Sequence, residues 1–211
     1  NGFWQPVKYQ WHVLKLMEYF LNFTKSHTPQ KGKNVGIYGD VVFGKNVRIG
    51  DNAVMHGPAY IGENSVIGNN VLVRHSHIGA HSVIGFGSEV ARSYLGNHAR
   101  LHNNYVGDSV IGNNVACGSG TVTGNFRLDE KNVSVNIKGE KVDCGSTKCG
   151  IIAGNNIRVG INTSFMPGVK IGSNSFVGAG IVVAEDVEEG TYVTGEWKLK
   201  KRQNVATIKP Q

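Results

Sequence analysis

Charged side chains are scarce in this chain, since Asp, Glu, Lys and Arg make up only 18% of its 211 residues. No apolar run approaches the roughly 18 residues that a membrane-spanning helix needs, so we expect no membrane partner. Cysteine occurs only three times, at Cys117, Cys144 and Cys149, and without CxxC spacing. This odd number argues against a disulfide framework and against a zinc ribbon. With no evident signal peptide, these absences favour a reduced, cytoplasmic protein.

The charge that is present is mainly positive, with a formal net charge of +7. Such a balance favours phosphate-bearing partners. The basic residues are dispersed until residues 198–202, and aromatic residues are not interleaved with them as base stacking would require. We therefore expect a small phosphorylated ligand and no nucleic acid.

Glycine is abundant, with 29 residues, but has no collagen-like period. From Val35 onward, a unit of aliphatic residue, Gly, any residue and often Asn recurs every six residues or a multiple of six. Clear copies are residues 49–54, 61–66, 67–72, 78–83, 111–116, 171–176 and 177–182. A hexapeptide period is typical of a parallel β-helix, in which three hexads close one triangular coil. The leading aliphatic residue points inward, and Gly or Asn tolerates the positive φ of a corner.

Two segments depart from the repeat. In residues 1–33, apolar residues recur at helical spacing from Val7 to Leu21, which predicts one amphipathic helix followed by a linker. Residues 125–150 are polar and lack hexads, and the alternation around Val135 predicts a hairpin. Long loops in regular solenoids are usually functional. We predict an N-terminal segment (1–33), a β-helix with this excursion loop (34–193) and a basic tail (194–211).

One stretch resembles a known family. Residues 102–112 (HNNYVGDSVIG) and 118–126 (GSGTVTGNF) resemble the acetyltransferase domain of bifunctional N-acetylglucosamine-1-phosphate uridyltransferases. Archaeal-type sugar-1-phosphate nucleotidylyltransferase/amino-sugar acetyltransferases look closer still, through residues 129–150 and 162–169. The resemblance covers residues 35–187. It implies a left-handed β-helix that transfers an acetyl group from acetyl-CoA to glucosamine- or galactosamine-1-phosphate.

The first residues extend the resemblance. Residues 2–6 (GFWQP) and 11–14 (WHVL) resemble the segment that closes a sugar nucleotidylyltransferase domain. The resemblance implies that this chain is the C-terminal part of a bifunctional enzyme. The nucleotidylyltransferase domain, which uses Mg²⁺, is then expected upstream.

The resemblance also implies catalytic roles. His102 is expected to be the general base, because an imidazole that titrates near neutrality can take the proton from the attacking amine. The backbone N–H near Ser119 is expected to stabilise the developing oxyanion. The alternatives are a surface histidine at a coil corner and a small residue required by a tight coil.

Four residues are expected to bind the phosphorylated amino sugar. Tyr105 is expected to hydrogen-bond the sugar or its phosphate, and Asn125 and Lys131 match family positions that contact the sugar. Arg92 is a candidate phosphate ligand, because a guanidinium can bind phosphate through two parallel hydrogen bonds. The alternatives are that Tyr105 packs on the next coil and that Lys131 is a solvated loop lysine.

The coenzyme is expected to lie along later coils. Ala179 and Gly180 stand where the family contacts acetyl-CoA, and Lys198 and Lys200 are expected to meet its phosphates or to remain solvated. One coil face is too narrow to enclose so large a molecule, so we predict a homotrimer with sites at subunit boundaries.

Three departures and two rival interpretations remain. Ala91, Ala116 and Ser134 stand where family members carry a lysine, an asparagine and a second loop lysine. Because these three substrate contacts are missing, a second interpretation remains open. In it, the β-helix is not catalytic and instead oligomerises or regulates a nucleotidylyltransferase for UDP-, dTDP- or GDP-sugars. A γ-class carbonic anhydrase shares the fold, but its His-x4-His pair is absent here, so we expect no metal ion.

Overall fold

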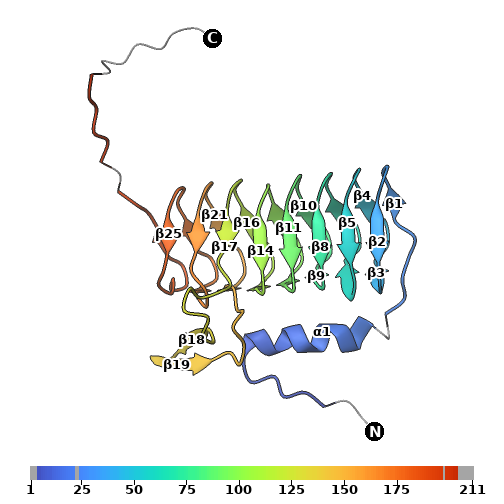
Figure 1. Cartoon of the computed structure of the whole chain (residues 1–211), viewed down its shortest axis with the longest axis horizontal. Helices are drawn as coiled ribbons and strands as arrows, with labels where there is room; N and C mark the ends of the chain where they lie inside the picture. Colours follow the sequence, from blue (N-terminus) through green and yellow to red (C-terminus); the bar gives the residue numbers. More distant parts are fainter. Residues whose placement is uncertain (1–3, 22–23, 197, 204–211) are drawn as a thin grey trace.

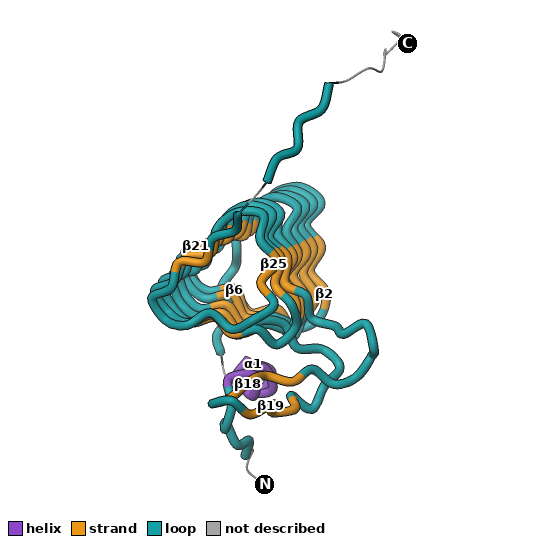
Figure 2. Tube along the Cα trace, turned by 90° about the vertical axis from the view of Figure 1, so that its left-hand side faces the viewer, coloured by secondary structure: helices purple, strands orange, loops and turns teal. Residues whose placement is uncertain are grey.

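The computed structural model describes residues 4–21, 24–196 and 198–203. Its body is a left-handed parallel β-helix whose three sheets form the sides of a triangular prism (Figures 1 and 2). The predicted fold class is confirmed, including the N-terminal helix and the single excursion loop. None of the helices in the described part of the chain is long and apolar enough to cross a membrane. Parts of the predicted N-terminal segment and tail, residues 1–3, 22–23, 197 and 204–211, lie outside the described residues.

Each coil contributes strands to the three sheets in turn. Sheet A contains β1 (Gln30–Lys31), β4 (Arg48–Ile49), β7 (Val66–Ile67), β10 (Val83–Ile84), β13 (Arg100–Leu101), β16 (Ala116–Cys117), β21 (Arg158–Val159), β24 (Phe176–Val177) and β26 (Tyr192–Val193). Sheet B contains β2 (Gly36–Tyr38), β5 (Val54–His56), β8 (Leu72–Arg74), β11 (Glu89–Ala91), β14 (Tyr105–Gly107), β17 (Val122–Thr123), β22 (Ser164–Phe165) and β25 (Val182–Val183). Sheet C contains β3 (Val41–Phe43), β6 (Ala59–Ile61), β9 (His77–Ile78), β12 (Tyr94–Leu95), β15 (Val110–Ile111), β20 (Ile152–Ala153) and β23 (Lys170–Ile171).

The hexads explain both the core and the corners. On sheet A, Ile67, Ile84 and Leu101 are in register on successive strands and fully buried inside the prism. At the corner between sheets A and B, Asn52 and Asn103 adopt left-handed backbone conformations, with φ of 57° and 50°. Asparagine tolerates this region better than most residues, so the Gly-x-Asn pattern turns the chain while the aliphatic residue fills the coil.

The excursion leaves the coil near Asn125 and returns at Gly150 without interrupting the stack. The Ser109 N–H donates to Ser93 Oγ (3.0 Å), and Ser109 Oγ accepts from the Ile151 N–H (3.1 Å). The loop carries an antiparallel hairpin, β18 (Ser134–Ile137) and β19 (Glu140–Asp143). The coils on either side of the loop are therefore neighbours, and the loop projects from the corner between sheets B and C (Figure 2).

A second apolar cluster joins the N-terminal segment to the excursion. Trp11, in the 3₁₀ helix η1 (Gln10–His12), is buried with residues of the hairpin, with Cys149 and with Ile152 of β20. The following helix, α1 (Val13–Leu21), lies along the outer face of sheet C (Figures 1 and 2).

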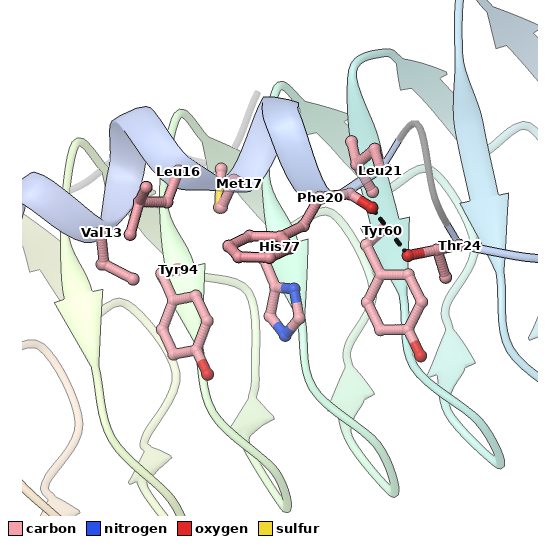
Figure 3. Close-up of a pocket in the computed structure, with 9 residues that line it drawn as sticks. All are labelled: Val13, Leu16, Met17, Phe20, Leu21, Thr24, Tyr60, His77 and Tyr94. Atoms are coloured by element: carbon pink, nitrogen blue, oxygen red, sulfur yellow. Dashed lines mark hydrogen bonds between the residues drawn. The ribbon is translucent and has the colours of Figure 1, made fainter. Parts of the chain in front are cut away.

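An aromatic stack lies beneath α1. The His77 ring lies between Tyr60 and Tyr94, with ring centroids 4.9 Å and 4.5 Å away. These rings and the apolar side of α1, including Met17 and Phe20, line a cavity of about 370 Å³ (Figure 3). The stack occupies successive outward positions of sheet C, where the register places residues of adjacent coils side by side.

We expect this stack to make the stability of the folded protein depend on pH. Burial lowers the pKa of His77 from 6.5 to about 4. Between these values the unfolded chain binds a proton that the folded chain excludes, so stability is complete above pH 6.5 and falls toward pH 4, by on the order of 3 kcal/mol. Urea unfolding at about pH 7 and about pH 4.5 measures the loss, which His77→Phe is expected to diminish.

The matched control is His56→Phe, which alters a histidine stacked on Tyr38 on sheet B at 5.0 Å. It is expected to retain the acid-induced loss of the unmodified chain. An equal acid-induced loss in the His77 variant and the unmodified chain would contradict the assignment.

Candidate functional site

The predicted base and coenzyme contacts lie along one edge of the prism, where sheet A turns into sheet B. His102 follows β13, Ser119 follows β16 on the adjacent coil, and Ala179 and Gly180 follow β24. The pairings of β13 with β16, β21 and β24 in turn place Ala179 three coils beyond His102. With strands about 4.8 Å apart, this part of the edge spans about 14 Å.

The groups on this edge are accessible. His102 is exposed, and its backbone N–H is held by Asn104 Oδ1 at 2.5 Å. The Ser119 carbonyl accepts from the Asn162 N–H at 2.9 Å, while none of the backbone hydrogen bonds among the described residues uses the Ser119 N–H. An exposed imidazole therefore lies one coil from a backbone donor that is available to a ligand.

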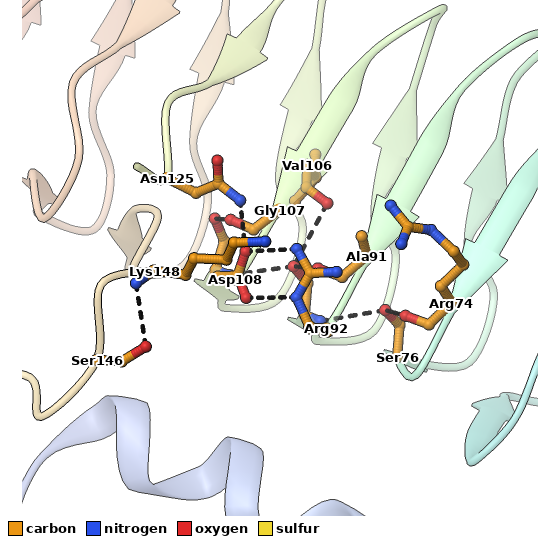
Figure 4. A network of polar contacts seen from close by, with 12 residues as sticks. Arg74, Ser76, Ala91, Arg92, Val106, Gly107, Asp108, Asn125, Ser146 and Lys148 are labelled. Carbon is orange, nitrogen blue, oxygen red and sulfur yellow. Dashed lines mark hydrogen bonds and ion pairs between the residues drawn. The ribbon is translucent and has the colours of Figure 1, made fainter. Parts of the chain in front are cut away.

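A polar cluster lies at the opposite edge of sheet B, where the chain turns into sheet C (Figure 4). Arg92 Nε and Nη2 donate to the two Asp108 carboxylate oxygens at 2.7 and 2.8 Å. Asn125 Nδ2 donates to Asp108 Oδ2 and to the Tyr105 hydroxyl, the latter at 3.1 Å. The structure thus brings Arg92, Tyr105 and Asn125 together around Asp108.

The polar cluster holds the Arg92 guanidinium in its charged form. The hydrogen bond to Asp108 is the main cause that raises the pKa of the Arg92 guanidinium, opposed by partial burial and reinforced by the charge of Asp108. Asp108 itself is buried, with 8% of its surface exposed. The guanidinium is therefore held in one orientation, and its Nη1 group is not engaged by Asp108.

Sheet B connects the two groups. Tyr105 and Gly107 are the ends of β14 and lie about 7 Å apart at about 3.3 Å per residue, so the strand leads from one edge of the sheet toward the other. The hydroxyl of Tyr105 lies beside Gly107, where an added Cβ would approach it to 2.5 Å. The aromatic ring therefore lies along the sheet, between His102 on one side and Arg92 on the other.

The sequence analysis missed two members of the polar cluster. Asp108 lies within the segment 102–112 that carries the resemblance, but it was assigned no role; in the structure it is a corner residue with a left-handed φ of 49°. Lys148 forms an isolated β-bridge with Phe126, and its side chain extends toward Asp108 and Asn125 (Figure 4). The length of one coil could have identified Asp108, because it follows Arg92 by sixteen residues and therefore lies beside Arg92 on the next coil.

The remaining predicted residues lie elsewhere. Lys131 is an exposed residue of the excursion whose backbone N–H contacts Asp129 Oδ1 at 3.4 Å. Lys198 and Lys200 follow β26 in an exposed segment that extends away from the prism (Figure 1). The structure therefore brings none of these three lysines into the polar cluster or onto the edge near His102.

The histidines of the β-helix are distributed over different parts of the prism. His81 and His98 stack at 5.1 Å at the corner between sheets C and A, His77 lies under α1, and His102 lies at the edge between A and B. Among the described residues, no group of three His, Cys, Asp or Glu side chains is arranged to hold a metal ion.

Comparison with known families gives two matches. The GMPPB C-terminal domain matches residues 37–142, and the hexapeptide repeat of succinyl-transferase matches residues 150–185. Bifunctional protein GlmU of Methanocaldococcus jannaschii is 39% identical over 208 residues, which cover 92% of this chain and 48% of that protein. The chain therefore spans about half the length of this relative.

Two further comparisons are more partial. The bifunctional sugar-1-phosphate nucleotidylyltransferase/acetyltransferase of Sulfurisphaera tokodaii is 46% identical over 91 residues, 43% of this chain and 23% of that protein. Among solved structures, perosamine N-acetyltransferase from Caulobacter crescentus, in complex with CoA and GDP-perosamine, is 20% identical. The structural match covers 66% of this chain and 49% of that enzyme's chain, with a TM-score of 0.40.

Proposed function

Because the chain belongs to the GMPPB C-terminal domain family, and because its relatives confirm the resemblance to archaeal bifunctional sugar-1-phosphate enzymes, we propose that it transfers an acetyl group from acetyl-CoA to an amino-sugar 1-phosphate. The observation that carries this proposal is the placement of His102 one coil from the free Ser119 N–H, on the edge that also carries Ala179. The amino sugar is glucosamine- or galactosamine-1-phosphate.

The chemistry needs a base and an oxyanion donor. The substrate amine attacks the thioester carbonyl, a C–N bond forms, and the C–S bond to CoA breaks. His102 takes the proton from the amine and returns it to the departing thiolate, so the base is regenerated. The Ser119 N–H faces the carbonyl oxygen as negative charge develops there.

The edge between sheets A and B binds acetyl-CoA, and the edge between sheets B and C binds the phosphate of the sugar. The pantetheine arm lies along the A–B edge past Ala179 and Gly180, while the sugar lies over Tyr105 with its phosphate toward Arg92. Asn125 and Lys148 lie with Arg92 at the end of the site that binds the phosphate, and Lys131 remains a proposed contact from the excursion loop. Lys198 and Lys200 remain proposed contacts of the coenzyme phosphates.

The proposal extends to the whole protein. We infer a homotrimer, since His102 and Ser119 lie exposed on the edge between sheets A and B, where a neighbouring subunit would enclose the reactants. We also infer an upstream nucleotidylyltransferase domain that uses Mg²⁺. The odd number of cysteines, without CxxC spacing, favours a cytoplasmic location.

The test is a direct assay of acetyl transfer. The protein is mixed with acetyl-CoA and glucosamine-1-phosphate or galactosamine-1-phosphate, and both free CoA thiol and the N-acetylated product are measured. Equal amounts of thiol and product are expected. Absence of product with both sugars would favour the non-catalytic alternative, which the Ala91, Ala116 and Ser134 departures keep open.

Arg92 offers a prediction on substrate binding. Arg92→Gln removes the cation but keeps hydrogen-bonding capacity, so KM for the sugar phosphate is expected to rise about tenfold, with a smaller change in kcat. Arg74→Gln is the matched control, because Arg74 pairs with Glu89 one coil away on the same sheet. An unchanged KM in the Arg92 variant would remove this residue from the phosphate site.

A further inference from the structure

Two cysteines bracket an exposed turn at the base of the excursion hairpin. Cys144 follows β19 and is half-buried, whereas Cys149 is 4% exposed. Both belong to the apolar cluster that contains Trp11. The residues between them are exposed, and Gly145 has a left-handed φ of 70° with open space around it. The turn can therefore adjust without disturbing the packed cluster.

The two thiols pack in the same apolar cluster and interact with each other. The Cys149 thiol donates a hydrogen bond to Cys144, which lowers the pKa of Cys144 and raises that of Cys149, and burial raises the pKa of Cys149 further. Cys144 is the more accessible of the two thiols, because it is half-buried, whereas Cys149 is shielded within the cluster. This is the asymmetry expected between an attacking and a resolving cysteine.

The pair is connected directly to the polar cluster. The Cys149 N–H donates to the Asn125 carbonyl at 3.0 Å, and the next N–H, that of Gly150, donates to the Asp108 carbonyl at 2.8 Å. Asn125 and Asp108 in turn orient Tyr105 and Arg92. Any shift of the chain at Cys149 therefore reaches two members of the cluster through single hydrogen bonds.

We propose that Cys144 and Cys149 form a reversible dithiol–disulfide site that reacts with small-molecule disulfides and adjusts the polar cluster. The Cys144 thiolate attacks one sulfur of the small disulfide, which releases one small thiol and leaves a mixed disulfide. Cys149 then loses its proton and attacks Cys144 Sγ, which releases the second small thiol. Two electrons pass from the protein to the small disulfide, and the two protein protons pass to the released thiolates.

The third cysteine provides an internal control. Cys117 lies inside the β-helix, and burial raises the pKa of its thiol to about 12. It is therefore expected to remain reduced in the folded protein while the pair reacts. The same treatment thus reports on all three cysteines of one molecule.

The experiment treats the folded chain with oxidised glutathione, blocks the remaining thiols and maps the cysteine-containing peptides by mass. We expect an internal Cys144–Cys149 disulfide, reversed by a dithiol reductant, with Cys117 free. Cys149→Ser is expected to retain glutathione on Cys144, whereas Cys144→Ser is expected to react at least about tenfold more slowly. Circular dichroism verifies that both variants fold, and Cys149→Ala replaces Cys149→Ser if the latter does not.

Several outcomes would overturn the proposal. These are three free thiols after treatment, stable glutathione on both cysteines without an internal disulfide, or equal reaction of Cys117. The expected effect on the cluster, a several-fold higher KM for the sugar phosphate after oxidation, rests on the proposed acetyltransferase. An inactive reduced protein would overturn that function while the peptide map still decides the dithiol site, and an active protein without the disulfide would overturn only this site.

Discussion

Replacement of His102 by alanine is expected to lower kcat for acetyl transfer by about 10²- to 10⁴-fold, the usual contribution of a general base. The side chain is exposed at a corner, and the hydrogen bond that orders this corner comes from the backbone N–H, so the fold is expected to remain intact. Steady-state release of the CoA thiol measures the loss, and thermal unfolding checks the fold.

The matched control for this prediction is His98→Ala. His98 is also an exposed corner histidine of the same coil, but it lies at the corner between sheets C and A, where it stacks on His81. Its removal is expected to leave kcat within about twofold, because it touches neither edge of sheet B. If the His102 variant forms product as fast as the His98 variant does, His102 is not the base.

The repeats in the sequence predicted the fold because each hexad carries its own local information. A typical copy has an aliphatic residue that fills the coil and an Asn that turns the chain, as at Ile67 and Asn70. The excursion was predictable for the complementary reason, since Asn125 to Gly150 lack this pattern.

Contacts between outward side chains were not predictable in this way. The hexad leaves outward positions unspecified, so the stacking of Tyr60, His77 and Tyr94 follows only from the register of three coils. The pairing of Arg92 with Asp108 likewise depends on the sixteen residues between them. The resemblance identified Tyr105 and Asn125, and the chemistry of the guanidinium identified Arg92, while their common partner Asp108 emerges from the packing.

The largest loss of stability is expected from Phe165→Ala. Phe165 ends β22 inside the prism, is 1% exposed and is one of the largest fully buried side chains among the described residues. Truncation of a buried Phe costs about 3–5 kcal/mol, because a narrow coil with neighbours at fixed spacing cannot collapse around the cavity. Urea unfolding measures this loss, and Phe176→Ala, which truncates a half-exposed Phe on sheet A, is expected to cost less than about 1 kcal/mol.

The location of the damage is as informative as its size. Coils of a solenoid are stabilised mainly by their immediate neighbours, so loss of packing at Phe165 is expected to weaken the terminal coils first. Hydrogen exchange is then expected to accelerate in β24 and β25, while β7 and β10 retain protection. Since Ala179 and Gly180 connect β24 with β25, KM for acetyl-CoA is expected to rise before the coil that carries His102 is affected. Uniform loss of protection over all coils would instead mean that the β-helix unfolds as one unit.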